Sequence, residues 1–268
     1  MKDCREEWYD KEAKVAVTIV DVTSAAQELA RGHLAGPTST HFLTEALASV
    51  ALLGAEMSEK DETVILQMKC KGPLGGYNVE CTSEGTLRGY AEKKTLDGFD
   101  GLGKPDARKV VGEAQIQVTR SVPGRILSQG ISTSVDGYLA GSLQRKACIR
   151  TEVAVSDEVE VLEARGILVE ILPDSKIGST GADPLLRILD EKSPVKLSVA
   201  SRSIPKQLGL ENAELRKTTL LKFACRCSPD RAIAMLAALG VEERKALPPT
   251  VDITCHMCGR TFTVKTRE

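Results

Sequence analysis

Four cysteines near the C-terminus constrain this chain more than any other feature of its sequence. They form two short pairs, Cys225-x-Cys227 and Cys255-x-x-Cys258, with residues 228–254 between them. Two pairs with such a separation can converge on one tetrahedral Zn²⁺ ion with four thiolate ligands. Thiolates can also be oxidised, so the same cysteines raise the possibility of a redox switch. Which of the two uses applies decides what the protein does.

Each pair has a local setting that suits a shared ion. Cys225 and Cys227 are two positions apart, and in an extended segment such side chains point to the same face. Cys255 and Cys258 are three positions apart and precede Gly259. This arrangement suits a tight turn, because glycine adopts backbone conformations that other residues resist.

The segments around the two pairs predict a small module with little core of its own. Residues 251–253 and 261–264 are typical of two short strands that carry the second pair on their turn. Between the pairs, Ser228 and Pro229 begin a helix that ends at Gly240. The apolar face of this helix consists of Ile233, Leu236 and Leu239. Structural zinc supplies roughly 10–16 kcal/mol of apparent binding free energy in such modules, so removal of the metal is expected to unfold this one.

A permanent zinc site is the commoner use of four such cysteines, but two sequence features favour a metal that can leave. Four basic residues lie close to the cysteines in sequence and favour thiolate character, namely Lys222, Arg226, Arg231 and Arg260. Each pair is also close enough to form its own internal disulfide, although the Cys-x-Cys ring is tight. His256 could in principle replace one thiolate, but its place inside the turn directs it away from the ion.

The composition of the 268-residue chain is that of an ordinary globular protein, with 42% hydrophobic and 27% charged residues. The formal net charge of −1 provides no electrostatic surface for nucleic acid or for an anionic membrane. The charged start does not resemble a secretory signal, and no apolar run approaches the ~18 residues that span a bilayer. We therefore expect a cytoplasmic protein whose cysteines serve metal or redox chemistry rather than a permanent disulfide framework.

The order of the predicted elements indicates an α+β fold, because strands and helices mix without a strict βαβ alternation. We expect helices near residues 23–34, 39–57 and 136–147, the second of them buried on one broad face. Strands are expected near residues 15–22, 64–70, 77–81, 86–93, 113–120, 124–130, 151–155 and 166–172. Three parts follow: a large N-terminal mixed α/β core domain over residues 1–174, a helical linker of marginal stability over 175–222, and a small C-terminal zinc-binding module over 223–268.

Two of the other cysteines fall in a predicted hairpin. If this hairpin is centred near Leu74, Cys70 faces Tyr77 and Cys81 faces Leu66. The two cysteines would then share a face without being opposed, so no bond between them is expected.

The remaining cysteines and the histidines lie outside any recognisable motif. Three cysteines are interpreted as small buried hydrophobic residues: Cys70, Cys81 and Cys148. Cys4 is interpreted as an exposed thiol in the N-terminal tail. His33 and His41 lie at predicted helix ends and are interpreted as surface or capping residues. The sequence thus offers no constellation typical of an ordinary enzyme.

With these motifs in place, the chain resembles the redox-regulated chaperonins of the heat-shock-protein-33 type. The specific part of the resemblance is the cysteine pattern with its flanks, Cys225-Arg226-Cys227-Ser228-Pro229-Asp230-Arg231 and Ile253-Thr254-Cys255-His256-Met257-Cys258-Gly259. The body of the chain is similar at residues 47–53, at the Gly72-Pro73-Leu74 turn, at residues 87–90 and at residues 164–173. The resemblance is colinear over nearly the whole chain.

This resemblance implies a cytosolic, ATP-independent holdase, and not an enzyme, that binds unfolded or partly folded client proteins under oxidative stress. It implies that Cys225, Cys227, Cys255 and Cys258 hold one Zn²⁺ per chain in a reduced, inactive form. It further implies that oxidation forms the redox-active disulfides Cys225–Cys227 and Cys255–Cys258, with release of zinc. The module and the linker then lose structure and apolar surface becomes available. Activated members of the family associate as homodimers.

Two segments depart from the family pattern. Residues 136–146 keep the family's helix but lack its usual aromatic pair and acidic residue. Residues 242–249 contain Pro248-Pro249 where the family usually carries a longer acidic helix. Both departures concern client binding and linker stability rather than the four cysteines.

Two other functions are compatible with four cysteines. A constitutive zinc-ribbon module for binding partners would need no oxidation. However, residues 223–268 hold seven Lys/Arg against five Asp/Glu, and their only aromatics are Phe223 and Phe262, so no surface for nucleic acid is evident. A thiol–disulfide oxidoreductase would place its Cys-x-x-Cys at a helix N-terminus, whereas Cys258 leads into a predicted strand.

Overall fold

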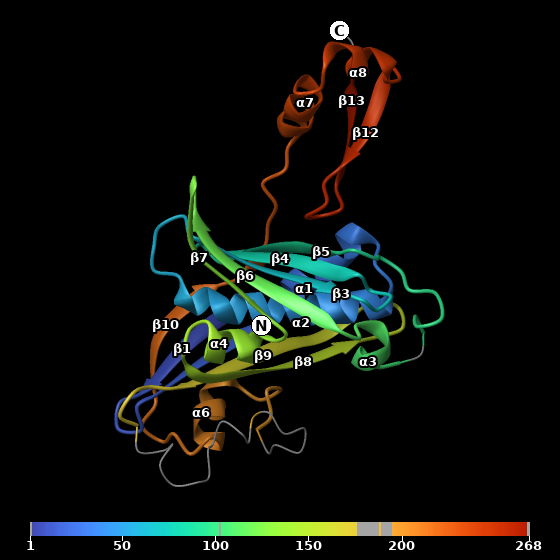
Figure 1. Cartoon of the computed structure of the whole chain (residues 1–268). Coiled ribbons are helices and arrows are strands. Elements are labelled where there is room, and N and C mark those ends of the chain that lie inside the picture. Colours follow the sequence, from blue (N-terminus) through green and yellow to red (C-terminus); the bar gives the residue numbers. More distant parts are fainter. Residues whose placement is uncertain (1, 102, 176–187, 189–194, 267–268) are drawn as a thin grey trace.

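The computed structural model describes residues 2–101, 103–175, 188 and 195–266. These residues form a five-stranded sheet, a six-stranded sheet and a two-stranded hairpin, together with several helices. The α+β fold predicted from the sequence is confirmed. Figure 1 shows the two large sheets as layers with helices α1 and α2 between them, and the C-terminal module projecting from one end.

Five strands form the first sheet in the order β10-β1-β2-β9-β8, and all neighbours are antiparallel. Their bounds are Cys4–Asp10 for β1, Val15–Asp21 for β2, Lys146–Val155 for β8, Val161–Ile171 for β9 and Glu214–Leu220 for β10. This sheet joins the first residues of the chain to residues from the predicted linker.

Six strands form the second sheet in the order β11-β5-β4-β3-β6-β7. Their bounds are Thr63–Cys70 for β3, Gly76–Thr82 for β4, Thr86–Ala91 for β5, Ala114–Val122 for β6, Arg125–Ser132 for β7 and Lys222–Phe223 for β11. The short β11 is parallel to β5 and the other neighbours are antiparallel. Strand β11 leads directly into the first cysteine pair.

The helices of the core lie mainly between the sheets (Figure 1). Their bounds are Thr23–His33 for α1, Pro37–Leu53 for α2, Ala107–Val110 for α3 and Val135–Gly141 for α4, with a 3₁₀ turn η1 at Gly54–Glu56. Among the helices that the structure describes, none combines the length and apolar character that crossing a bilayer requires.

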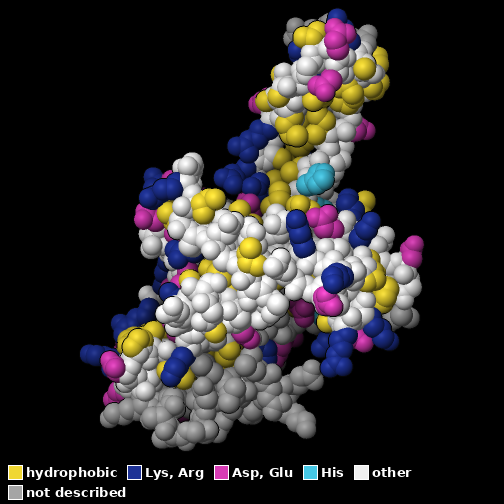
Figure 2. Space-filling model, viewed as in Figure 1, with side chains coloured by type: hydrophobic (Ala, Val, Ile, Leu, Met, Phe, Trp, Pro, Cys, Tyr) yellow, Lys and Arg dark blue, Asp and Glu magenta, His cyan; other side chains and the backbone are white. Residues whose placement is uncertain are grey.

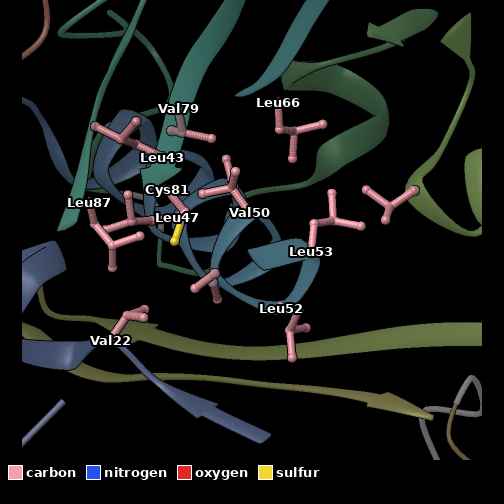
Figure 3. Packing of buried hydrophobic residues seen from close by; sticks show 14 of the residues in the cluster. Val22, Leu43, Leu47, Val50, Leu52, Leu53, Leu66, Val79, Cys81 and Leu87 are labelled. Carbon is pink, nitrogen blue, oxygen red and sulfur yellow. The ribbon is translucent and has the colours of Figure 1, made fainter. Parts of the chain in front are cut away.

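Helix α2 is buried on nearly all sides, so the prediction of one broad buried face is wrong. Its residues pack against β4 and β5 of one sheet and against β8 and β9 of the other. Figure 3 shows Leu47 and Val50 near Val79 and Cys81, with Leu52 on the side of the other sheet. Since two sheets enclose the helix, its small and hydroxyl residues are buried together with its leucines.

The start of the chain is a strand rather than a free tail, so Cys4 is half-buried in β1 and the prediction of an exposed tail thiol is wrong. The neighbouring Asp3 is buried, and its carboxylate accepts hydrogen bonds from the amides of Ser24 and Ala25 at 3.1 and 2.6 Å. It thereby satisfies two of the free amides at the start of α1. The charged residues of β1 gave no alternation of apolar residues from which a strand could be predicted.

The β3–β4 hairpin forms in a register two residues from the predicted one. Cys81 pairs with Val64, and Tyr77 pairs with Met68. The amide of Gly75 donates to the carbonyl of Gly72 at 3.1 Å, which centres the turn earlier than Leu74. Both hairpin cysteines are free thiols, and Cys81 is fully buried whereas Cys70 is half-buried.

Part of the predicted linker covers the outer face of the five-stranded sheet. Residues 176–187 and 189–194 lie outside the described residues, and the remainder contains a 3₁₀ turn η3 at Ser201–Ser203, the short helix α6 at Ile204–Gln207, and β10. The buried linker side chains over the sheet are Ile188, Val195, Leu197, Ile204 and Leu210. Figure 1 shows α6 on the side of this sheet away from α2.

The C-terminal module contains helix α7 at Pro229–Ala237, helix α8 at Val241–Ala246, and a hairpin of β12 at Thr250–Thr254 and β13 at Thr261–Lys265. The predicted hairpin is confirmed, and the hydroxyl of Ser228 accepts a hydrogen bond from the Arg231 amide at the start of α7, as expected. Gly240 does not end this helix but precedes α8. Ile233 on α7 is 51% exposed, and Figure 2 shows apolar atoms on the surface of the module.

Candidate metal centre

The four predicted cysteines converge at the base of the module. Cys225 and Cys227 lie on the extended segment between β11 and α7, while Cys255 and Cys258 lie on the turn between β12 and β13. Their four Sγ atoms all lie within 4.8 Å of one another. All four are free thiols in the structure. Among the described residues, they form the one group of three or more potential metal ligands of this kind.

The spacing of the sulfur atoms fits a tetrahedral site. The Sγ atoms of Cys225 and Cys255 are 3.7 Å apart, and those of Cys227 and Cys258 are 3.4 Å apart. Zinc–thiolate bonds of about 2.3 Å imply edges of about 3.8 Å between the ligand atoms of a tetrahedron. Both of these contacts connect one pair with the other, which is what four ligands around one centre require. The donor set and its spacing therefore suit a Zn²⁺ ion.

The turn that carries the second pair depends on Gly259. The Cys255 carbonyl accepts from the amide of Gly259 at 2.8 Å, and the Cys255 amide donates to the carbonyl of Arg260 at the same distance. Gly259 has a φ of +72°, a conformation that side chains resist. This geometry places Cys255 and Cys258 on the side of the turn that faces the first pair, as predicted.

The charge nearest to the sulfur atoms comes from the core. Nη1 of Arg88, on β5, donates to Sγ of Cys225 at 3.5 Å, and Nε of the same guanidinium pairs with Glu80. Arg226, one of the four basic residues expected near the cysteines, pairs instead with Glu80 at 3.4 Å. Arg88 was missed from the sequence because 137 residues separate it from Cys225.

The four thiols differ in acidity. Burial raises the pKa of Cys225, but hydrogen bonds from the Cys227 backbone and from Arg88 outweigh burial and lower it to about 7. Burial is the main reason that the pKa values of Cys227 and Cys255 are raised and that the pKa of Cys258 is raised to about 11. Without a metal, Cys225 is thus the thiol that most readily becomes a thiolate and reacts.

The cysteine turn is docked on the core at the end of α1 and along β5. The amide of Gly89 donates to the Met257 carbonyl at 3.2 Å. Gly32 and Gly259 lie back to back, because a Cβ atom added at Gly259 would be 1.9 Å from the Gly32 carbonyl oxygen. His256 contacts the ring of Tyr90 edge-on, with centroids 5.8 Å apart, and is outside the cysteine group, as expected.

The other histidines are structural, but not in the way that was predicted. His33 is buried, and its Nε2 lies 2.8 Å from the Gly89 carbonyl oxygen, next to the docked turn. His41 is also buried, and its Nε2 lies 3.3 Å from the Glu45 carboxylate one turn along α2. The interpretation of both as surface or capping residues is therefore wrong, whereas Cys148 is buried as expected.

Comparison with known proteins places this chain in a family. The family model described as Hsp33 protein matches residues 7–265. A 33 kDa chaperonin of Symbiobacterium thermophilum is 28% identical over 258 residues, covering 90% of this chain and 86% of that protein. One from Thermus thermophilus is 27% identical over 270 residues, covering 92% and 79%. The crystal structure of the 33 kDa chaperonin of Thermotoga maritima has the same fold, with a TM-score of 0.86 and 21% identity over 99% of this chain and 96% of that one.

Proposed function

The chain belongs to the Hsp33 family, whose members are chaperones and not enzymes, and from this premise we propose that it is an ATP-independent holdase activated by oxidation of its four clustered cysteines. One observation carries the proposal: four free thiols lie within 4.8 Å of one another at the contact between the module and the core. The module, residues 223–268, is proposed to be the redox switch of the chain.

In the reduced form, Cys225, Cys227, Cys255 and Cys258 hold one Zn²⁺ ion as thiolates. The ion supplies the cross-link that keeps the two cysteine segments together, and Arg88 offsets part of the negative charge of the four sulfurs. The described residues of the module contain three buried side chains, at Ala232, Cys258 and Val264. Their packing is too little to keep the module folded alone, so its structure depends on the metal.

Oxidation removes the ligands. In each pair two thiolates lose one electron each and form a disulfide, and one hydrogen peroxide molecule takes up both electrons and two protons to give two water molecules. Two peroxide molecules thus convert the site to the disulfides Cys225–Cys227 and Cys255–Cys258. No thiolate is left to bind the zinc, which is released.

The apolar surface for clients is proposed to lie under the linker, residues 175–222. The covered face of the five-stranded sheet consists of Val15, Val17, Ile19, Cys148, Ile167, Val169 and Ile171. The linker is held there by its apolar side chains and by polar contacts such as the one from Arg165 Nη1 to the Leu197 carbonyl at 2.8 Å. Loss of this cover would expose a contiguous apolar face of the core, residues 1–174, to unfolding proteins.

Three further features complete the proposal. The zinc stoichiometry is one ion per chain, because one four-cysteine group is present among the described residues. The oxidised protein is a homodimer, since exposed apolar surface favours self-association. The protein acts in the cytoplasm, where a reducing environment keeps the thiols free until oxidative stress arises.

The test compares reduced and oxidised protein. Zinc-loaded protein is treated with hydrogen peroxide at elevated temperature, and zinc release, sedimentation and suppression of a client's thermal aggregation are measured. We expect all three to change together. Equal suppression by both forms, or zinc that stays bound after oxidation, would contradict the switch and favour a constitutive zinc-ribbon binding module.

Disulfide mapping by mass spectrometry tests the pairing separately. The proposal requires bonds within the pairs, whereas the sulfur atoms are also in contact between the pairs, Cys225 with Cys255 at 3.7 Å and Cys227 with Cys258 at 3.4 Å. Bonds of the second kind would keep the turn tied to the first segment. Detection of those bonds in the active form would contradict the release of the module.

A further inference from the structure

Strand β10 occupies the outer edge of β1 while burying little of its own surface. Six residue pairs align the two strands antiparallel, from Cys4 opposite Leu220 to Tyr9 opposite Glu214. Six of the seven β10 residues are exposed and the seventh is half-buried. The strand is therefore held mainly through the main-chain ladder with β1 rather than through burial.

The side chains of β10 show which face of the five-stranded sheet is enlarged by a strand that pairs with β1. Leu215 lies opposite Trp8, and Trp8 in turn lies opposite Val17 on β2. Directly opposed residues point to the same face of a sheet, so Leu215 borders the apolar face that the linker covers. Leu220, opposite Cys4, borders the same face. Both leucines are largely exposed, at 46% and 61%.

Charge also distinguishes this edge. β1 carries three acidic residues, Glu6, Glu7 and Asp10. On β10, Lys217 Nζ lies 3.9 Å from the Glu7 carboxylate, and the Arg216 guanidinium lies over the Tyr9 ring, 5.7 Å from its centroid. The edge thus fits an extended segment that presents apolar side chains to one face and basic side chains to its acidic neighbours.

β10 is bounded on both sides by segments whose order depends on the switch. It lies near the end of the linker, and only a short stretch separates its last residue, Leu220, from Cys225. In that stretch Leu221 donates to the Asp3 carbonyl and Ala224 donates to the Leu87 carbonyl, at 2.9 and 3.1 Å. Release of the cysteine segment and of the linker residues before β10 would leave β10 attached only to β1.

We propose that β1 becomes an acceptor edge when β10 leaves, and that an extended segment of an unfolding client adds to it as a new antiparallel strand. The inference rests on the oxidation-activated function and specifies how clients are held. The unpaired amides and carbonyls of β1 supply sequence-independent bonds. The apolar face beside Trp8 receives alternate side chains of the client. In the reduced protein β10 holds this place and blocks it.

An edge strand of the other large sheet provides an internal reference. β7, residues Arg125–Ser132, is the last strand of the six-stranded sheet. Its edge does not contact β10, so its accessibility should not depend on the cysteines. A client that binds any free strand edge would protect β7 as well as β1, whereas the proposal predicts protection that is confined to β1 and appears only after oxidation.

The experiment uses the full chain and a synthetic peptide of residues 213–221, which spans β10. Hydrogen exchange is measured for residues 4–10 in reduced protein, in oxidised protein, and in oxidised protein with a thermally unfolding client or with the peptide. Trp8 is the sole tryptophan, so its fluorescence reports on the same edge. A peptide with proline at the positions of Lys217 and Thr218 is the control, because successive amides point to opposite sides and proline removes both.

We expect exchange of those amides in residues 4–10 that point toward β10 to be slow in reduced protein, fast after oxidation, and slow again with the client or the peptide. The amides that point toward β2 should stay protected throughout. The peptide should shift Trp8 emission only in oxidised protein and should reduce suppression of client aggregation, and the proline peptide should do neither. If residues 4–10 exchange equally fast with and without bound client while oxidation still activates the holdase, the acceptor edge is wrong and the switch stands. If oxidation does not activate the protein, both the acceptor edge and the oxidation-activated function are wrong.

Discussion

In the core, helix α2 is enclosed between two sheets, whereas helix α7 of the C-terminal module exposes Ile233 and Met235 to solvent. The same difference holds for whole regions. The core buries a continuous apolar cluster, with Leu47 and Leu52 fully inaccessible. The module has four clustered thiols in place of such a cluster. Burial of apolar area stabilises the core under any redox condition, whereas the proposed function requires that the module is folded only while its cysteines share a ligand.

This contrast is what the proposed switch requires, namely that one part of the chain unfolds while the other stays folded. A switch requires an element of low intrinsic stability next to one that stays folded. The contact between the two regions includes polar and backbone interactions, among them those of Arg88 with Cys225 and of Gly89 with Met257, and the edge-on contact of His256 with Tyr90. Such a contact can be lost without exposing the interior of the core.

The largest effect is expected from removal of two ligands. The double variant Cys225→Ser, Cys227→Ser should lose zinc and unfold the module, because roughly 10–16 kcal/mol of apparent binding free energy is lost with a structural zinc site. Hydrogen exchange should become fast across residues 223–266 and remain slow in α2. The variant should also suppress client aggregation in part without oxidant.

The matched control is Cys70→Ser, which changes a half-buried cysteine outside the cluster. It should bind zinc normally and respond to peroxide like the original protein. A double variant whose module stays protected would show that packing, and not the metal, holds the module, and the contrast between the two regions would be lost.

The second largest effect tests whether the core depends on charge. Glu62 is fully buried, and its carboxylate accepts from Arg120 at 2.7 Å and from the amides of Ser58 and Glu59 at 3.0 Å. Burial raises the pKa of Glu62, but the hydrogen bonds from Arg120 and the two amides outweigh it, so the net pKa is lowered. Glu62→Gln removes the carboxylate charge that pairs with Arg120, although Arg120 keeps its bond to the Glu56 carbonyl at 2.6 Å. It should cost about 1.5–3 kcal/mol of core stability at pH 7, the usual contribution of hydrogen bonds to a charged group.

The same residue gives a pH dependence with a definite sign. The pKa of Glu62 is lower in the folded protein than in the unfolded chain. At pH values between these two pKa values the unfolded chain therefore binds more protons, and stability rises with pH. The contribution of Glu62 is therefore complete above the ordinary pKa of 4.5 and lost as the pH falls through the folded pKa. Urea unfolding followed by Trp8 fluorescence should show this loss for the original protein and a smaller one for Glu62→Gln. If both proteins lost stability equally in acid, Glu62 would not be the source of this pH dependence. Zinc binding at pH 7 should be the same in both proteins.

The sequence predicted the local parts of the site well. The cysteine spacing, the turn at Gly259, the flanking hairpin and the cap at Ser228 all depend on residues within a few positions of one another. Local backbone preference and ligand geometry decide such features, so they can be inferred without the fold. The α+β class followed in the same way from the order of periodic segments.

What could not be predicted depends on contacts distant in the chain. β10 lacks the apolar alternation from which a strand is predicted, because an edge strand can be held through backbone bonds. Its partner β1 lies at the opposite end of the sequence, where Cys4 pairs with Leu220. His33 was misjudged because its partner, the Gly89 carbonyl, belongs to another element. The role of Arg88 was missed for the same reason, because its partner Cys225 belongs to another part of the chain. Polar residues give no signal in sequence of a distant partner that permits their burial.

The smallest effect concerns the docking contact itself, where Gly32 and Gly259 meet. Gly259→Ala adds a Cβ 1.9 Å from the Gly32 carbonyl oxygen and 3.0 Å from the Cα of His33. It also places alanine at a φ of +72°, which costs about 1–2 kcal/mol. Gly124→Ala is the matched control, because Gly124 has a φ of +77° but no atom within 4 Å of the added carbon.

Both variants should therefore share the backbone strain, and only Gly259→Ala should displace the turn from α1 and β5. Exchange of the Gly89 amide, which donates to Met257, should accelerate in Gly259→Ala and stay unchanged in Gly124→Ala. Peroxide should then activate Gly259→Ala faster, because the turn has already left the core. If the two variants behave alike, the glycine contact adds nothing to the attachment of the module, and the metal alone would separate the stable region from the conditional one.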